Sequence, residues 1–195
     1  MNRTLRLFVA IELPEAVKDE LGKLIDALNA LNTGGVRCVR SEGVHLTLKF
    51  LGNVDSRRVD TLSEALKQAV AGRTAFRLQL GQAGAFPNLH RPRVLWVGID
   101  GDMTTLSTLQ ADVEDELADV GFSKEERGYN PHLTLARIRR GSQPSSVERA
   151  TGILTSNPIN RHLEIPVTQI NLMRTELHPD GAIHRCMVSI PLLHG

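Results

Sequence analysis

One tetrapeptide occurs twice in the sequence. His45-Leu46-Thr47-Leu48 is repeated as His132-Leu133-Thr134-Leu135, at an offset of 132 − 45 = 87 residues. The apolar segments 7–12 and 95–100 are also similar, at an offset of 95 − 7 = 88 residues. Two copies of such a tetrapeptide would arise by chance on the order of once in tens of thousands of chains of this length. The nearly equal offsets therefore indicate one duplicated unit.

Each repeat begins with the pattern of a strand followed by a helix. Residues 6–13 form an almost continuous apolar run, typical of a strand covered on both faces, and Pro14 is tolerated in the first turn of a helix. Residues 95–100 and the helical pattern after them repeat this order. We expect further strands near 36–40, 44–51, 76–80, 132–135, 162–177 and 182–192, and helices near 14–31, 55–70, 103–117 and 145–154.

These elements predict an α+β fold. The chain of 195 residues, 41% of them hydrophobic, is long enough to bury a substantial core. We expect one domain, 1–195, with two pseudo-symmetric lobes at approximately 1–86 and 93–192, each of which offers one histidine strand to a central cleft. An arrangement in which the terminal strands exchange between the lobes is left open.

Charge and cysteine content narrow the range of partners and compartments. The formal net charge of +1 gives no general attraction for nucleic acid, so recognition of RNA would depend on local arginine clusters. Cys38 and Cys186 are far apart in sequence and fit neither a zinc ribbon nor a disulfide framework. No apolar stretch approaches the roughly 20 residues that cross a bilayer. We therefore expect a cytoplasmic protein that does not associate with membranes. We also expect a monomer.

The repeated tetrapeptide places polar side chains on one face of each strand. Because side chains alternate along a strand, His45 and Thr47 share one face, and the leucines, together with Phe50, share the other. The same alternation applies to His132 and Thr134. Either histidine alone would more often be a satisfied structural residue, but the duplication favours a site.

The chemistry that suits this pattern is proton transfer at a phosphate. Imidazole titrates near pH 6.5, so that one histidine can remove a proton from the nucleophile and the other can protonate the departing oxygen. The hydroxyls of Thr47 and Thr134 can donate hydrogen bonds to the phosphate oxygens. The sequence has no His-x-His or His-Glu-x-x-His pattern, so we expect neither a metal nor any other cofactor.

Charged residues around the motifs are candidates for contacts to substrate. Lys49 continues the first histidine face at i+4, where it would contact phosphate or be a solvated strand-edge lysine. Among the arginines of the second half, Arg137 and Arg139 should alternate away from His132 and face outward or a helix. Arg127 and Arg139 are the candidates for phosphate binding. The other arginines of this group are Arg91, Arg93 and Arg140.

Aromatic side chains could stack on a nucleobase. Tyr129, Phe86 and Trp96 are the candidates, although a place in the core is favoured for Trp96. The remaining histidines have no partner at a telling spacing and are assigned no role: His90, His162, His178, His184 and His194.

Taken together, these motifs resemble the two-histidine (2H) phosphoesterase superfamily, and within it the LigT-like branch of bacterial and archaeal RNA 2',3'-cyclic phosphodiesterases. The resemblance covers nearly the whole chain. The segments that carry it are 6–11, 45–52 (His-Leu-Thr-Leu-Lys-Phe-Leu-Gly), 91–96, 131–137 (Pro-His-Leu-Thr-Leu-Ala-Arg) and 172–177. Two features depart from the family pattern. Residues 38–44 lack the usual tryptophan and prolines, and His184 stands where an aromatic residue is common.

The resemblance implies a bilobal fold and hydrolysis, without a cofactor, of a terminal RNA 2',3'-cyclic phosphate to a 2'-phosphate. It also implies an ATP-independent reverse reaction that joins RNA ends, such as those of tRNA fragments, through a 2'-5' linkage. By resemblance, His45 is assigned as the acid and His132 as the base. The alternatives are a phosphodiesterase that acts on a small cyclic nucleotide or on ADP-ribose cyclic phosphate, and a noncatalytic module that binds RNA ends.

Overall fold

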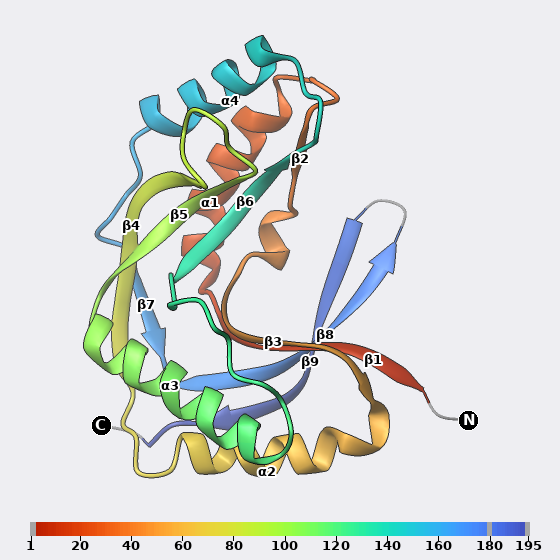
Figure 1. Cartoon of the computed structure of the whole chain (residues 1–195). Coiled ribbons are helices and arrows are strands. Elements are labelled where there is room, and N and C mark those ends of the chain that lie inside the picture. Colours follow the sequence, from red (N-terminus) through yellow and green to blue (C-terminus); the bar gives the residue numbers. More distant parts are fainter. Residues whose placement is uncertain (1–2, 179–180, 194–195) are drawn as a thin grey trace.

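The strands of the protein form two antiparallel sheets, one in each of two lobes (Figure 1). The computed structural model describes residues 3–178 and 181–193. The first sheet has the order β3-β1-β8-β9, and the second has the order β2-β6-β5-β4-β7. The strands are β1 (Thr4–Glu12), β2 (Val36–Cys38), β3 (His45–Asp55), β4 (Phe76–Phe86), β5 (Val94–Gly101), β6 (His132–Ile138), β7 (Glu164–Val167), β8 (Gln169–His178) and β9 (Gly181–Pro191).

Two of the four described helices are exchanged between the lobes. They are α1 (Glu15–Asn29), α2 (Val59–Ala69), α3 (Met103–Asp119) and α4 (Pro144–Ser156), with short 3₁₀ turns at η1 (Ser41–Gly43) and η2 (Ser56–Arg58). Helix α1 follows β1 of the first sheet but packs on β2 and β6 of the second, beside α4. Helix α3 follows β5 of the second sheet but packs on α2 and β3 of the first lobe. Each connection therefore crosses to the other lobe.

The strands are exchanged as well. The first sheet combines β1 and β3 with the C-terminal β8 and β9, and the second combines β2 and β4 with β5, β6 and β7. The ranges 1–86 and 93–192 therefore describe repeats in the sequence, whereas each spatial lobe takes elements from both. The expected α+β fold with two lobes is confirmed.

Both histidine strands contain an extra residue at the same place. In the pairing of β1 with β3, Ala10 lies opposite Thr47 and Val9 lies opposite Lys49, so that Leu48 is the additional residue of a β-bulge. In the pairing of β5 with β6, Leu135 is additional in the same way. A bulge inverts the alternation of side chains after it. Residues beyond each His-x-Thr pair therefore change face.

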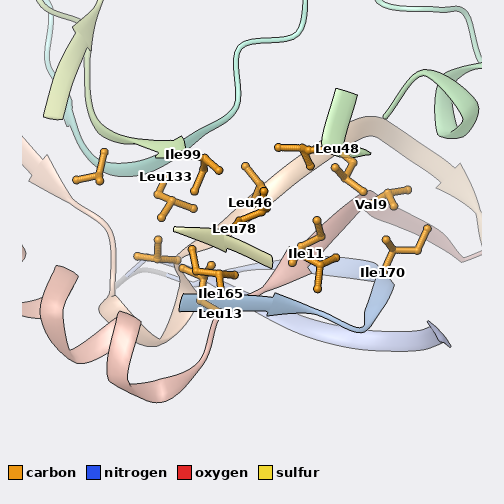
Figure 2. Close-up of a cluster of buried hydrophobic side chains, with 14 of the residues drawn as sticks. Val9, Ile11, Leu13, Leu46, Leu48, Leu78, Ile99, Leu133, Ile165 and Ile170 are labelled. Atoms are coloured by element: carbon orange, nitrogen blue, oxygen red, sulfur yellow. The ribbon is translucent and has the colours of Figure 1, made fainter. Parts of the chain in front are cut away.

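One apolar core runs through both lobes and holds the two motifs from behind. The leucines of both tetrapeptides are at most 3% exposed. Leu46 and Leu133 pack in the same cluster as Leu78 and Ile165 of the second sheet and Ile11 of the first (Figure 2). Because buried side chains are close-packed, the backbone on which the histidines stand has little freedom to move.

The prediction of one strand over 162–177 is wrong. The chain forms two strands there, which separate at Thr168. Strand β7 pairs with β4 of the second sheet, and β8 pairs with β1 and β9 of the first. Both strands have a periodicity of two, and only their pairing partners distinguish them. Among the helices of the described residues, none is long and apolar enough to span a membrane.

Candidate active site

A cleft of about 380 Å³ lies between the two sheets and brings the repeated motifs together. His45 and Thr47 of β3 line one side, and His132 and Thr134 of β6 line the other. These four side chains are neither fully buried nor fully exposed, so solvent or a ligand can reach them. The leucines between them face the core.

Each imidazole ring makes the same type of hydrogen bond, from Nδ1 to a backbone carbonyl oxygen two residues earlier. The Nδ1 atom of His45 lies 2.8 Å from the carbonyl oxygen of Gly43, and Nδ1 of His132 lies 2.7 Å from that of Asn130. A carbonyl oxygen can only accept, so Nδ1 must carry the proton in each ring. Nε2 is therefore the basic nitrogen of the neutral ring and becomes the donor when the ring is protonated. Each histidine is thus prepared for proton transfer through Nε2.

The environment of His45 favours the neutral ring. The pKa of His45 is lowered to about 4, chiefly by burial and to a smaller extent by the positive potentials of His184 and His132, whereas the hydrogen bond to Gly43 raises it. The ring lies against Phe8, with 4.5 Å between the centroids. Without a bound anion, His45 is therefore neutral at pH 7.

The cleft is positively charged. Its described lining includes Arg6 and Arg137 in addition to the histidines, and no aspartate or glutamate is present among these lining residues. A concave site with cations and no described carboxylate is suited to an anionic ligand, because the protein walls focus the field of the charged groups. The excess charge is local, since the net charge of the chain is only +1.

Comparison with known proteins agrees with this geometry. The family model described as LigT like Phosphoesterase matches residues 11–96 and 97–184. The chain belongs to the LigT-like phosphoesterase family. The two matched segments follow each other along the chain, and each contains one His-x-Thr pair.

Relatives of this LigT-like chain extend over almost its full length. The RNA 2',3'-cyclic phosphodiesterase of Methanothermobacter thermautotrophicus is 30% identical over 182 residues, covering 93% of this chain and 96% of the relative. That of Thermotoga maritima is 31% identical over 183 residues, covering 94% and 93%. Among solved structures, TT0787 of Thermus thermophilus matches with a TM-score of 0.78 at 24% identity, covering 96% of this chain and 98% of that one. E. coli LigT in complex with 3'-AMP matches with a TM-score of 0.74 at 25% identity, covering 97% and 99%.

The two β-bulges change which side chains of the LigT-like chain face the cleft. Two predictions from strand alternation are therefore wrong. Phe50 was expected on the leucine face, but it is 70% exposed and lines the cleft. Arg137 was expected to face away from His132, but it also lines the cleft. The physical reason is the additional residue in each strand, which turns the next side chains over.

The bulge at Leu48 also turns the side chain of Lys49 away from the cleft. Lys49 is only 6% exposed, and its ammonium group forms an ion pair with Glu114 of α3. The ammonium also donates to the carbonyl oxygen of Ser123, at 2.8 Å. The predicted position of Lys49 on the histidine face, where it would contact phosphate or solvent, is therefore wrong.

The Lys49–Glu114 pair belongs to a network that connects both motifs. Glu114 accepts hydrogen bonds from the side chain of Gln110 and from the backbone amide of Glu125. The loop that contains Glu125 continues to His132. The network therefore fixes the approach to the second motif against the strand that carries the first.

Tyr129 is a structural part of the same loop. Its hydroxyl donates to the carbonyl oxygen of Thr47 at 3.1 Å, and burial raises its pKa well above the usual range. A phenol used in this way holds the two motif strands together, and its ring is not available for a nucleobase. The expectation of base stacking at Tyr129 is therefore not supported by its position.

The remaining candidates lie outside the cleft. Arg127 is exposed in the loop before β6 and is not among the lining residues, and Arg139 lines a separate cavity with Arg91 and Arg93. Phe86 and Trp96 pack against each other on the far side of His132, with 4.9 Å between the ring centroids of Phe86 and His132.

His184 is a cleft residue that the sequence did not identify. Its ring is 4.9 Å from that of His45 and 5.1 Å from that of Phe8, and it lines the cleft. The only signal in the sequence is its position where the family commonly has an aromatic residue. His90, His162 and His178 are not among the residues of this cleft, and His194 lies outside the described residues. Within the described ranges, no group of three or more His, Cys, Asp or Glu side chains could hold a metal ion.

Proposed function

We propose that this protein hydrolyses the 2',3'-cyclic phosphate at the end of an RNA chain and leaves a 2'-phosphate. The observation that carries the proposal is the cleft itself. Two histidines with the same Nδ1 hydrogen bond face one cationic space from opposite sheets, each with a threonine two residues away. The names of the relatives support the substrate, since those from archaea and bacteria are called RNA 2',3'-cyclic phosphodiesterases.

The reaction needs two proton transfers. One histidine accepts a proton from water through Nε2 as the water oxygen forms a bond to phosphorus. The bond from phosphorus to O3' breaks, and the other histidine donates its Nε2 proton to that oxygen. The hydroxyls of Thr47 and Thr134 donate to the nonbridging oxygens as negative charge increases there. No step in this scheme uses a metal or another cofactor.

The roles of the two histidines are assigned from the resemblance to the family. We assign His45 as the acid and His132 as the base. The ring of His45 is neutral in the empty cleft, so it can act as the acid only if the anionic substrate raises its pKa on binding. In the opposite assignment His45 would be the base, a role for which its neutral ring is already suited.

A modified leaving group distinguishes the two assignments. Sulfur at the bridging 3' position leaves without protonation, so this substrate should restore turnover to the variant that lacks the acid and to no other. Rescue of His45→Ala supports the assignment, and rescue of His132→Ala reverses it.

The decisive experiment is incubation of the protein with an oligonucleotide that ends in a 2',3'-cyclic phosphate, in the presence of EDTA. We expect full turnover and a product with its phosphate on the 2' oxygen. A product with a 3'-phosphate would contradict the proposed cleavage of the bond to O3', and loss of activity that a divalent ion restores would contradict the two-histidine mechanism.

The reverse reaction is part of the proposal. If a 5'-hydroxyl takes the place of water, the same proton transfers join two RNA ends through a 2'-5' linkage without ATP, and tRNA fragments would be suitable ends. Incubation of the cyclic-phosphate oligonucleotide with an excess of a 5'-hydroxyl oligonucleotide tests this. We propose that the protein acts as a cytoplasmic monomer, and its two free cysteines support a reducing compartment.

A further inference from the structure

Three polar side chains form a row on the cleft face of the first sheet, next to His45. Arg6 of β1 lies directly opposite Thr175 of β8, and Thr175 lies directly opposite His184 of β9. Directly opposite residues of antiparallel strands project from the same face. All three line the cleft. We call Arg6, Thr175 and His184 the polar row.

The curvature of the sheet brings the polar row to the catalytic histidine. His45 and His184 stand on β3 and β9, which are the two edge strands of this sheet. In a flat sheet, three spacings would separate these strands by about 14 Å. Their rings are instead 4.9 Å apart, so the sheet is curled around the cleft. The end of β8 and the beginning of β9 rise out of the rest of the sheet (Figure 1).

The polar row can donate hydrogen bonds to an anion. It also contains a positively charged side chain that pairs with no described residue. Arg6 is exposed and forms no ion pair with any described residue. The nearby carboxylate of Glu176 is already paired with Arg174 and Arg185. The Thr175 hydroxyl lies 3.2 Å from Nδ1 of His184. When the hydroxyl donates to Nδ1, the neutral ring carries its proton on Nε2 and can donate it to an oxygen of a ligand.

We propose that the polar row binds a second phosphate group of the substrate, namely the phosphodiester on the 5' side of the nucleotide that carries the cyclic phosphate. This inference rests on the proposed function and specifies its substrate. A guanidinium, a hydroxyl and an imidazole are the groups that bind phosphate oxygens by charge-assisted hydrogen bonds. The polar row would therefore make the protein prefer an oligonucleotide to a single cyclic nucleotide.

The test is a ratio of two rates. The value of kcat/KM for a dinucleotide that ends in a 2',3'-cyclic phosphate is divided by that for the corresponding nucleoside 2',3'-cyclic phosphate. A general loss of activity cancels in this ratio. We expect Arg6→Gln and His184→Phe each to lower the ratio about tenfold, because one charge-assisted hydrogen bond is lost. The matched control is Arg185→Gln, which removes an arginine beside His184 that is not among the cleft residues. It should leave the ratio unchanged.

Each outcome bears on the proposal. An unchanged ratio in both Arg6→Gln and His184→Phe overturns it, and an equal fall in Arg185→Gln does so too. The second phosphate could instead belong to a pyrophosphate, so ADP-ribose cyclic phosphate is measured as a further substrate. If only its turnover depends on the polar row, the phosphate subsite stands and the assignment to RNA is overturned.

A binding measurement separates this inference from the proposed function. Calorimetry compares a dinucleotide that ends in a 2'-phosphate with the nucleoside 2'-phosphate. If the wild-type protein turns over neither cyclic substrate, the proposed hydrolysis fails. The phosphate subsite is still supported if tighter binding of the dinucleotide is lost in Arg6→Gln, and it is overturned if the two ligands bind equally well to the wild type.

Discussion

The lowered pKa of His45 predicts that the stability of the protein depends on this residue in mildly acidic solution. Burial holds the folded pKa at about 4, whereas the ring has a pKa of 6.5 when it is exposed. Between these values the unfolded chain binds a proton more readily than the folded one. The free energy of unfolding therefore falls as the pH is lowered through 6.5 toward 4, and the contribution is absent near pH 8.

The magnitude follows from the two pKa values. At pH 5 the exposed ring is almost fully protonated and the folded ring is mostly neutral. The linkage relation gives a loss of about 2 kcal/mol between pH 8 and pH 5. Solvent at the partly open ring screens the effect, so we expect about 1 to 2 kcal/mol from this one residue.

The assay compares the wild type with His45→Gln, in which the side chain stays neutral at every pH. Urea unfolding at pH 8 and at pH 5 gives the free energy for each protein. All other titrating groups are common to both, so the difference between the two pH-dependent losses isolates His45. If His45→Gln loses as much stability as the wild type, His45 is not neutral in the folded protein at pH 5. NMR titration of the ring provides an independent value.

Further substitutions test the two histidines, the two threonines and the Lys49–Glu114 ion pair. His45→Ala and His132→Ala should each slow turnover of the cyclic phosphate by about 10² to 10⁴-fold. The double variant should be little slower than the slower single variant, because both histidines act in one step. A double variant whose rate loss equals the product of the two single losses would contradict this. The pH profile of kcat/KM should be bell-shaped, because one histidine must be neutral and the other protonated. Thr47→Val and Thr134→Val should each lower the maximum of this profile by about 10-fold or more without moving its acidic or basic side along the pH axis. A shift of either side would show that the hydroxyl changes the pKa of a histidine. Lys49→Met should reduce the free energy of unfolding by about 3 to 5 kcal/mol, because the buried carboxylate loses its partner. Adding Glu114→Leu should restore only part of that loss, because it removes the unpaired carboxylate but also the acceptor of the Gln110 and Glu125 hydrogen bonds. Denaturant unfolding at pH 7 checks both.

The repeated motif could be interpreted from the sequence because its information is local. Alternation along a strand is sufficient to put His45 and Thr47 on one face, and the repeat at His132 and Thr134 predicts a second face like it. The structure brings these four side chains to one cleft. Their roles in catalysis remain proposals until the variants are measured.

Alternation failed where pairing between distant strands decides the result. The bulges at Leu48 and Leu135 exist because β3 pairs with β1, and β6 with β5, in a shifted register, and nothing in the residues around these positions specifies the shifts. Lys49, Phe50 and Arg137 were therefore placed on the wrong faces. His184 was missed for a similar reason, since it approaches His45 only through the curvature of a four-stranded sheet.

The exchange of helices between the lobes has a consequence for the origin of the duplication. One repeat alone would leave β1 without β8 beside it, β4 without β5, and the apolar side of α1 without β6, one of the two strands on which it packs. Such a half could bury its apolar surface only by pairing with a second copy that donates the same elements in return. A fusion of two such copies would convert a symmetric dimer into one chain, after which each histidine could acquire its own surroundings. The unequal neighbours of the two rings, Phe8 and His184 on one side and Phe86 on the other, are a difference that identical subunits could not have had.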